Sequence, residues 1–259
     1  MTTPMRVVLV SSAWLLLAGS GEMHAQHFPL ESTDRLELHN AVAKAATLQG
    51  KKGVQLTLSE AARARARQLD AMTPAEREAS MTPEERARVR HGLPLLTGLL
   101  ALVQGPKFSS GTIEVELAGA PEATAGEGAR GFVGIAFRVP EDRLTYDAFY
   151  LRPTNGRAAD QERRNHSVQY ISHPEWPWNR LRKETQERYE SYVDLVPNEW
   201  TKIKIEVDGQ RARLYVHGNE QPTLIVNDVK TGATASGRVA LWLEPGTVAH
   251  FRNLTVTPK

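Results

Sequence analysis

The segment from residue 203 to residue 216, IKIEVDGQRARLYV, contains two short runs in which apolar and polar residues alternate. Ile203, Ile205 and Val207 alternate with charged residues before a turn at Asp208-Gly209, and the alternation resumes after the turn. A period of two places the apolar residues on one face of a strand, and Asp-Gly is a preferred two-residue hairpin turn. The segment therefore predicts an antiparallel β-hairpin with one buried face.

The same alternation recurs through most of the chain, in short runs separated by turn residues. Further strands are expected at 36–38, 54–58, 112–117, 132–139, 149–151, 168–171, 189–195, 224–226, 239–243 and 254–256. Many short strands without long crossover connections are typical of an antiparallel β-sandwich. The sequence therefore predicts an all-β fold, with residues 26–259 forming a single sandwich domain.

Residues 59–92 differ in composition, because they are rich in Ala, Arg and Glu. They contain a near-repeat in which Thr73 and Thr82 are each followed by Pro and, three residues later, by Glu76 and Glu85. This is the capping-box arrangement with proline at the first helical position. We expect two or three short helices inserted between strands. Because acidic residues are interleaved with the arginines, a solvated face is favoured over a surface for an anionic partner, and a protein partner is a third alternative.

The overall composition excludes several classes of protein. The chain has 259 residues, with 32 Lys and Arg against 30 Asp and Glu, which gives a net charge of +2. This charge predicts no nucleic-acid partner, and a polar, nearly uncharged ligand such as a glycan fits it better than a polyanion. The absence of cysteine excludes disulfides, zinc–thiolate sites, iron–sulfur clusters and cysteine nucleophiles.

Residues 1–25 have the features of a secretory signal peptide. Arg6 precedes the apolar run Val7–Ala18, and small residues then lead to cleavage positions after Ser20 or Ala25. The alternative is a membrane anchor, but twelve residues are short of the about 20 that a membrane-spanning helix needs. We therefore expect export to the periplasm or the extracellular space, with no membrane span in the mature chain.

The order of motifs in the second half of the chain resembles a known superfamily. The motifs are Glu199-Trp200, the hairpin 203–216, Pro222-Thr-Leu, Asp228-Val-Lys, Gly237-Arg-Val-Ala-Leu-Trp and Phe251-Arg-Asn-Leu. Over residues 100–258 this order is similar to the concanavalin A-like lectin/glucanase superfamily, which includes laminin G-like modules and the 3-keto-disaccharide hydrolase domain family. The resemblance implies a jelly-roll sandwich in which ligands occupy the concave face of one sheet.

The alternation predicts which side chains lie on that concave face. If Val133, Ile135 and Phe137 face the core, the intervening residues face the other way. By this parity we expect ligand-binding side chains at Arg138, Tyr150, Arg152 and Tyr192, with Glu190 beside them and Gly134 and Ala136 leaving room for a ligand. Gln169 is a further candidate, although the parity of its strand is ambiguous because Val168 and Tyr170 could equally well face inward.

Two tryptophans in the loop 173–178 complete the expected ligand site. Trp176 and Trp178 offer indole faces on which a sugar ring can stack. The alternative is structural: the arginines and Glu190 could form cross-strand ion pairs, and the tryptophans could close the end of the core.

An enzyme of the 3-keto-glycoside hydrolase or lyase type is the alternative to a binding module. It would use Glu190 and His173 as acid and base, with Arg138 or Arg152 stabilising an oxyanion. The family's Asn-Ser-Gly step is replaced here by Thr154-Asn155-Gly156, which weakens this assignment.

A glucanase of family 16 would need alternating acids on the concave face. Only Glu114 and Glu116 alternate, and we expect both to face solvent because Ile113 and Val115 are their apolar neighbours.

The sequence indicates no metal site and no cofactor. The eight histidines are scattered, and Asp208 and Asp228 lack the acid spacing of a calcium loop. The function that the sequence favours is carbohydrate recognition, with the enzyme and a protein-interaction module as alternatives.

Overall fold

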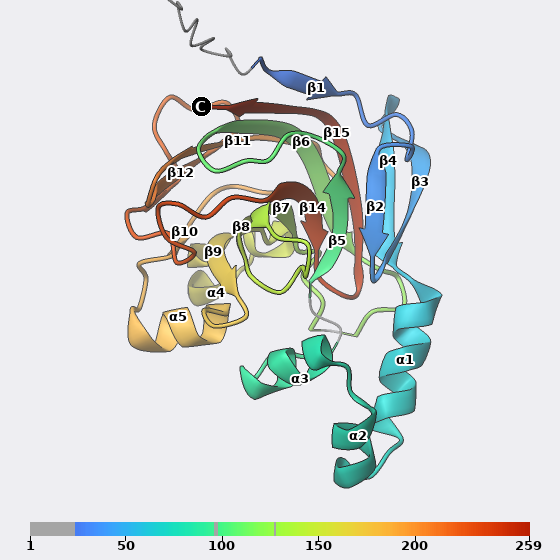
Figure 1. The fold of residues 1–259 in the computed structure, drawn as a ribbon. Coiled ribbons are helices and arrows are strands. Elements are labelled where there is room, and N and C mark those ends of the chain that lie inside the picture. The colour runs from blue at the N-terminus through green and yellow to red at the C-terminus, as the bar shows by residue number, and fades with distance from the viewer. Residues whose placement is uncertain (1–23, 96–97, 127) are drawn as a thin grey trace, which may run out of the picture.

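Two antiparallel β-sheets packed against each other form the body of the protein (Figure 1). The computed structural model describes residues 24–95, 98–126 and 128–259. The predicted antiparallel sandwich is therefore confirmed. The predicted signal peptide lies outside the described residues except for His24 and Ala25.

The first sheet has eight strands in the order β13-β12-β11-β6-β15-β4-β3, with β1 paired to β15. Its strands are β1 (Gln26–Phe28), β3 (Ala41–Leu48), β4 (Lys51–Leu58), β6 (Gly111–Pro121), β11 (Thr201–Asp208), β12 (Arg211–Val216), β13 (Leu224–Val226) and β15 (Thr247–Pro258). The hairpin predicted over residues 203–216 is β11 and β12, which pair in antiparallel register. The loop between them is Gly209-Gln210, one residue later than the predicted Asp208-Gly209 turn, because Asp208 itself pairs with Arg211.

The second sheet has seven strands in the order β10-β9-β8-β7-β14-β5-β2. Its strands are β2 (Leu36–His39), β5 (Leu99–Val103), β7 (Val133–Val139), β8 (Tyr146–Leu151), β9 (Val168–His173), β10 (Glu190–Ser191) and β14 (Arg238–Leu243).

The eight-stranded sheet is amphipathic, as its alternating sequence predicts. Ile113 and Val115 of β6 are buried between the sheets, whereas Glu114 and Glu116 point outward. Each outward glutamate pairs with a lysine, and the shorter of these ion pairs joins Glu114 to Lys202 at 3.2 Å. The expectation that these two acids face solvent is confirmed, so they form no catalytic pair on a concave face.

The central strands of the seven-stranded sheet are buried on both faces. Every residue of β7, β8 and β9 is buried. On the inner face, Phe108, Phe137, Phe149, Tyr170 and Tyr189 form a continuous series of ring contacts with centroid separations of 5.4–6.3 Å. Such aromatic contacts add stability beyond the area that they bury, and they fix the spacing of the two sheets.

The outer face of the seven-stranded sheet, named here the covered face, lies beneath other parts of the chain. Gly98 lies against Tyr146, because a Cβ at Gly98 would come within 2.7 Å of the tyrosine oxygen and 3.4 Å of Arg88. The backbone of Gly98 also has a φ of +69°, which glycine adopts without steric cost. The expected open concave face is therefore closed over part of its surface.

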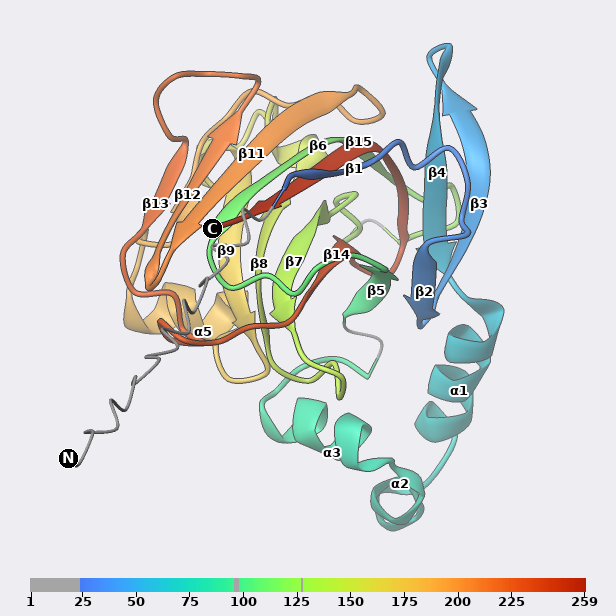
Figure 2. The same ribbon diagram turned by 45° about the horizontal axis from the view of Figure 1, so that its top comes forward.

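The predicted helical insertion is present as α1 (Glu60–Asp70), α2 (Pro74–Ser80) and α3 (Pro83–Arg90). Thr73 and Thr82 form the two predicted capping boxes with Glu76 and Glu85. Figures 1 and 2 show α1 continuing from β4 and all three helices extending away from one end of the sandwich.

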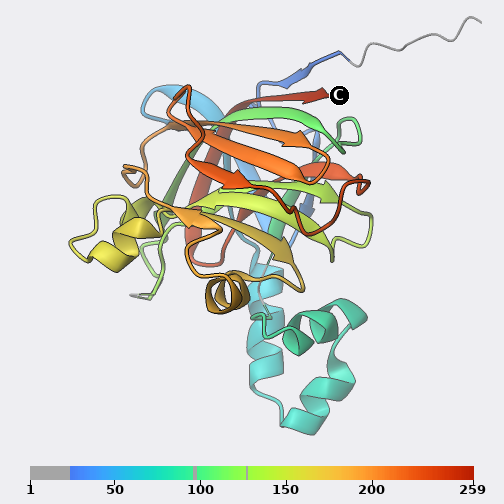
Figure 3. The same ribbon diagram turned by 90° about the vertical axis from the view of Figure 1, so that its left-hand side faces the viewer.

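Three short helical segments were not predicted, and they lie in the connections between β8 and β10, away from the helical insertion. They are η1 (Pro153–Asn155), α4 (Gln161–Asn165) and α5 (Trp178–Glu184). Figure 3 shows α4 and α5 outside the sheets, at the edge where β8 and β9 lie. Among the described residues, no helix combines the length and hydrophobicity needed to cross a membrane.

The prediction that Arg138 lies on the concave face is wrong, because a bulge breaks the alternation of β7. Arg138 has a φ of +58°, and the register between β7 and β14 shifts beside it. Its guanidinium is fully buried between the sheets and donates hydrogen bonds of 2.7–2.9 Å to the carbonyl oxygens of Ser109, Gly209 and Gly232. The Arg138 Nη1 also lies 3.9 Å from the carboxylate of Asp147. Arg138 is therefore a structural cation without access to a ligand.

The strand predicted over 189–195 is much shorter than expected. Only Glu190 and Ser191 pair with β9, and the chain then leaves the sheet. Tyr192, expected on the concave face, is instead 47% exposed and lines a separate surface hollow with His217. β10 is an edge strand and pairs only with β9. Alternation predicts which side chains of a strand face inward, but it does not show how far an edge strand stays paired.

We predict that Arg138→Leu lowers the free energy of unfolding by about 3–5 kcal/mol, because it leaves the Asp147 carboxylate buried without its cation and removes the donors to three carbonyls. Chemical denaturation measures this change. The control Arg213→Leu, on the exposed outer face of β12, should change the free energy by no more than about 0.5 kcal/mol. A loss below about 1 kcal/mol in Arg138→Leu would contradict the structural role.

Candidate functional site

One row of side chains crosses the covered face from edge to edge of the seven-stranded sheet. The strand registers align, in order, Glu190, Gln169, Tyr150, Gly134, Trp242, Leu100 and His39. The parity of β9 is thereby settled: Gln169 faces the same side as Tyr150. A cavity lies at each end of the row, and its centre is closed.

The centre of the row is filled by the protein's own aromatic rings. Tyr150 and Trp242 stack above Gly134 with ring centroids 4.7 Å apart and an angle of 30° between the planes. A Cβ on Gly134 would lie 2.6 Å from the Cβ of Tyr150. The room that we expected above Gly134 for a ligand is therefore occupied by these two buried side chains.

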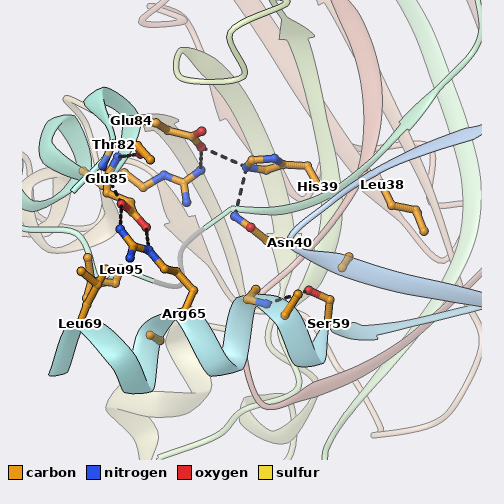
Figure 4. A pocket seen from close by; sticks show the side chains of 15 residues that line it. Leu38, His39, Asn40, Ser59, Arg65, Leu69, Thr82, Glu84, Glu85 and Leu95 are labelled. Carbon is orange, nitrogen blue, oxygen red and sulfur yellow. Dashed lines mark hydrogen bonds and ion pairs between the residues drawn. The ribbon is translucent and has the colours of Figure 1, made fainter. Parts of the chain in front are cut away.

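The cavity at the His39 end, named here the His39 cavity, has a volume of about 460 Å³ and lies between the helical insertion and β2 (Figure 4). Its charged side chains pair with one another. Arg65 donates two hydrogen bonds of 3.0 Å to Glu85, and Glu84 contacts both Arg88, at 2.6 Å, and His39, at 3.0 Å. The charged groups in this cavity therefore have partners within the protein.

The cavity at the Glu190 end, named here the Arg152 pocket, has a volume of about 500 Å³. This volume is within the range of small-molecule sites. The pocket opens between the loop that precedes β7, the segment from η1 to α4, and α5. Its lining combines arginines with aromatic and polar side chains: Gly128, Arg130, Phe132, Arg152, Asn155, Asp160, Glu162, Arg163, His166, Trp178 and Arg182.

Arg152 forms the floor of this pocket and is itself 4% exposed. Its Nη2 donates to the Tyr150 hydroxyl at 2.8 Å and to Gln169 Oε1 at 2.9 Å. Its Nη1 donates to Glu190 Oε1 at 3.0 Å and to the carbonyl oxygen of His166 at 3.2 Å. Its Nε–H has no hydrogen-bond partner among the residues that the structure describes. Three of the sequence-predicted side chains, those of Tyr150, Gln169 and Glu190, thus meet at the guanidinium of a fourth, Arg152.

Glu190 is held as a carboxylate by two arginines. Its side chain is 3% exposed, and it accepts hydrogen bonds from Arg152 and from both Nε and Nη2 of Arg182 in α5. Burial raises the pKa of Glu190, but the hydrogen bonds from Arg182 and the charge of Arg152 outweigh burial, so its pKa lies below the usual value. Glu190 is therefore a poor proton donor near neutral pH.

Trp178 provides the exposed aromatic surface of the pocket. It is the first residue of α5 and is 44% exposed. The guanidinium carbons of Arg182 and Arg152 lie 4.8 and 5.9 Å from the centre of its ring, within the range of cation–π attraction. These contacts hold the indole beside the polar floor while leaving part of it open to a ligand.

His173 and Trp176, also predicted for the site, lie elsewhere. His173 is buried and stacks on Tyr146 with ring centroids 5.2 Å apart. It lies four positions along β9 from Gln169, the partner of Glu190, which corresponds to about 13 Å of strand. Trp176 is partly buried against the core and packs against Arg180 and Lys230. The structure does not bring His173 together with Glu190.

Three residues that matter to the pocket were not identified from the sequence: Arg163, His166 and Arg182. They lie in or beside α4 and α5, helices of five and seven residues without a strong periodic pattern. The one available signal was Asp160, which caps α4 by accepting a 2.7 Å hydrogen bond from the backbone N–H of Arg163.

Burial, together with the charges of Arg182 and Arg152, lowers the pKa of His166 despite the opposing effect of Glu190.

No cluster of three or more histidine and carboxylate side chains suited to a metal ion occurs within the described ranges.

Comparisons with known proteins identify solved structures of the concanavalin A-like lectin/glucanase fold. A carbohydrate-binding module, CBM66 from Bacillus subtilis, is 13% identical, with 85% of this chain and 96% of that chain covered and a TM-score of 0.45. A protein of unknown function with a galectin-like fold, also from Bacillus subtilis, is 10% identical, with 90% and 94% covered and a TM-score of 0.48.

A Crh5 transglycosylase in complex with NAG is 12% identical, with 90% of this chain and 83% of that chain covered and a TM-score of 0.46. No protein family and no curated protein matches the chain. The matches concern the fold alone and assign no residue of this chain, so the function is argued below from the pocket itself.

Two titratable groups, buried His173 on the covered face and half-buried Glu244 directly after β14, predict opposite pH effects on stability. Burial lowers the pKa of His173 to about 3, below its ordinary value of 6.5. As the pH falls below 6.5 the unfolded chain takes up a proton that folded His173 does not, so this group lowers stability by about 2 kcal/mol at pH 5. Burial raises the pKa of Glu244 to about 7 from 4.5, so this group adds stability at pH 5 that is lost as the pH rises through 7.

The free energies of unfolding at pH 7 and pH 5 test this prediction. For each variant the measured quantity is its free energy of unfolding minus that of wild type. Between pH 7 and pH 5 this difference should rise by about 2 kcal/mol for His173→Phe and fall by about 2 kcal/mol for Glu244→Gln. Parallel pH profiles for the wild type and both variants would show that neither group has a shifted pKa.

Proposed function

We propose that the chain is a carbohydrate-binding module and that the Arg152 pocket is its binding site. The observation that carries the proposal is the exposed indole of Trp178 beside a fixed set of hydrogen-bonding groups in a cavity of about 500 Å³. A sugar ring presents an apolar face of C–H groups that stacks on an indole, while its hydroxyls need directed polar partners. The pocket offers both kinds of surface.

The polar floor of the pocket is preorganised for binding. Arg152 is fixed by four hydrogen bonds, and Gln169 also donates from Nε2 to the carbonyl oxygens of Tyr170 and Tyr189 at 3.0 and 3.2 Å. A ligand therefore orders few side chains when it binds, which reduces the entropic cost of association.

A binding role fits this pocket better than proton transfer to or from a substrate. The Glu190 oxygens are occupied by arginines, and the second proposed catalytic group, His173, lies on another part of β9. Hydrolysis of a glycosidic bond needs an acid with a raised pKa placed across the bond from a second carboxylate. Glu190 has a lowered pKa instead. The helical insertion as a protein-binding surface stays a prediction.

Export of the chain is part of the proposal, and it places the pocket where glycans of the cell surface or the medium are accessible. It is supported by the apolar run Val7–Ala18 and by the start of β1 at Gln26, directly after the proposed cleavage position at Ala25. Cleavage there would leave every strand of the described sandwich intact.

We predict that the exported protein, expressed with its native N-terminus in a bacterial host, begins at Gln26. N-terminal sequencing of the periplasmic or secreted fraction measures this. Retention of residues 1–25 in the membrane fraction would instead indicate an anchor.

We predict that Trp178→Ala weakens glycan binding at least about tenfold, equivalent to about 1.4 kcal/mol, because it removes the stacking surface. A glycan-array screen of the wild type would identify a ligand, and titration calorimetry would then compare the variants. The matched control is Tyr192→Ala, which removes a similarly exposed aromatic ring outside the pocket and should leave the affinity unchanged. An equal loss in both variants, or no glycan bound by the wild type, would refute the proposal.

A further inference from the structure

Arg163 is a pocket cation for which the described part of the chain supplies no ion pair. It lines the Arg152 pocket from α4. Within the described part of the chain, its guanidinium makes one hydrogen bond, from Nη2 to the amide oxygen of Asn155 at 3.5 Å, and its Nε has no partner although it is buried. No carboxylate of the described residues forms an ion pair with it.

The acids near Arg163 are committed to other groups or face solvent. Glu190 receives its hydrogen bonds from Arg152 and Arg182. Asp160 accepts the backbone N–H of Arg163 at 2.7 Å and so serves as the cap of α4. Glu162 lies on α4 and is exposed. The pocket therefore presents a half-buried guanidinium whose charge has no ion-pair partner among the described residues.

We propose that the pocket selects a sugar that carries an anionic group, with Arg163 as the partner of that group and Trp178 as the stacking surface for the ring. The inference rests on the carbohydrate-binding function proposed above and narrows its ligand to acidic glycans. The planar guanidinium matches a carboxylate in two parallel hydrogen bonds, and charge-assisted hydrogen bonds are stronger than neutral ones.

A neutral sugar would satisfy this site less well. Its hydroxyl groups would supply at most neutral acceptors to Arg163 and would displace the water that hydrates the guanidinium. The carboxylate of a hexuronic acid and a sulfate ester share the required chemistry of a compact anion on a sugar. The pocket is therefore expected to distinguish charged from uncharged sugars more sharply than one sugar stereoisomer from another.

The test uses pairs of hexasaccharides that are matched in linkage and stereochemistry and differ only in oxidation of the hydroxymethyl group to a carboxylate. Gluco-, manno- and galacto-configured pairs are titrated by calorimetry, together with the corresponding sulfate esters. For the wild type we expect the acidic member of at least one pair to bind at least about tenfold more tightly than the neutral member. The sulfate esters show whether the site takes the carboxylate alone or either anion.

Two variants that each remove one positive charge separate the pocket from general electrostatic attraction. Arg163→Gln should reduce the preference for the acidic member, measured as the ratio of the two affinities within a pair, to less than about twofold. The control Arg213→Gln, on the exposed outer face of β12, should retain the full preference.

Each outcome decides the inference. Equal affinities within every pair, a preference that survives Arg163→Gln, or a preference that Arg213→Gln reduces as strongly would overturn acidic selectivity while leaving carbohydrate binding in place. Failure of the wild type to bind any member, acidic or neutral, on the array or in titration would overturn the proposed function itself and the inference with it.

Discussion

The burial of the Arg152 guanidinium is the constraint on which the rest of the pocket depends. Removing a charge from water costs free energy unless the charge is paired and hydrogen-bonded. Both Nη groups of Arg152 are hydrogen-bonded, to Tyr150 of β8, Gln169 of β9, Glu190 of β10 and the carbonyl of His166. These partners come from three adjacent strands and from the loop after α4. Through Glu190 the network also reaches Arg182, which fixes α5 and with it Trp178. One buried cation thus positions both the floor and the wall of the pocket.

The small net charge of the chain does not indicate the concentration of arginines in the Arg152 pocket. The net charge of +2 led us to expect an uncharged ligand. This net charge is the sum over many positive and negative side chains, which pair with one another on the surface and in the His39 cavity. A ligand responds to the local potential in a pocket rather than to the total charge, and Arg163, which has no ion pair among the described residues, makes that potential more positive. Arg163 therefore gives the pocket a preference that the total charge could not indicate.

Most of the fold could be predicted from the sequence because alternation reports directly on burial. The hairpin of β11 and β12, the outward-facing Glu114 and Glu116 and the caps at Thr73 and Thr82 all follow from local patterns. Within the site, parity placed Tyr150 and Arg152 on the correct face but failed at Arg138, where a bulge inserts a residue of positive φ.

Other parts of the site depend on tertiary contacts that leave little trace in the sequence. Gln169 was ambiguous because β9 is buried on both faces, so its sequence is not amphipathic. The short helix α5 packs on β9 through Leu181, and α4 contacts η1, so neither depends on a periodic pattern of its own. The pairing of Tyr150 with Trp242 joins residues far apart in the chain. The occupation of the space above Gly134 therefore could not be foreseen.

The two cavities at the ends of the covered row show why similar volumes do not make equivalent sites. In the His39 cavity, an anionic ligand that recruited Arg65 or Arg88 would have to compete with Glu85 or Glu84, and a displaced carboxylate would lose its hydrogen bonds in a partly buried place. In the Arg152 pocket, an anion that contacts Arg163 replaces only water and a long hydrogen bond to Asn155. In the His39 cavity the arginines already have carboxylate partners, whereas in the Arg152 pocket Arg163 has no carboxylate partner among the described residues and is free to pair with a ligand. The difference in free energy comes from the prior state of the arginines rather than from their number.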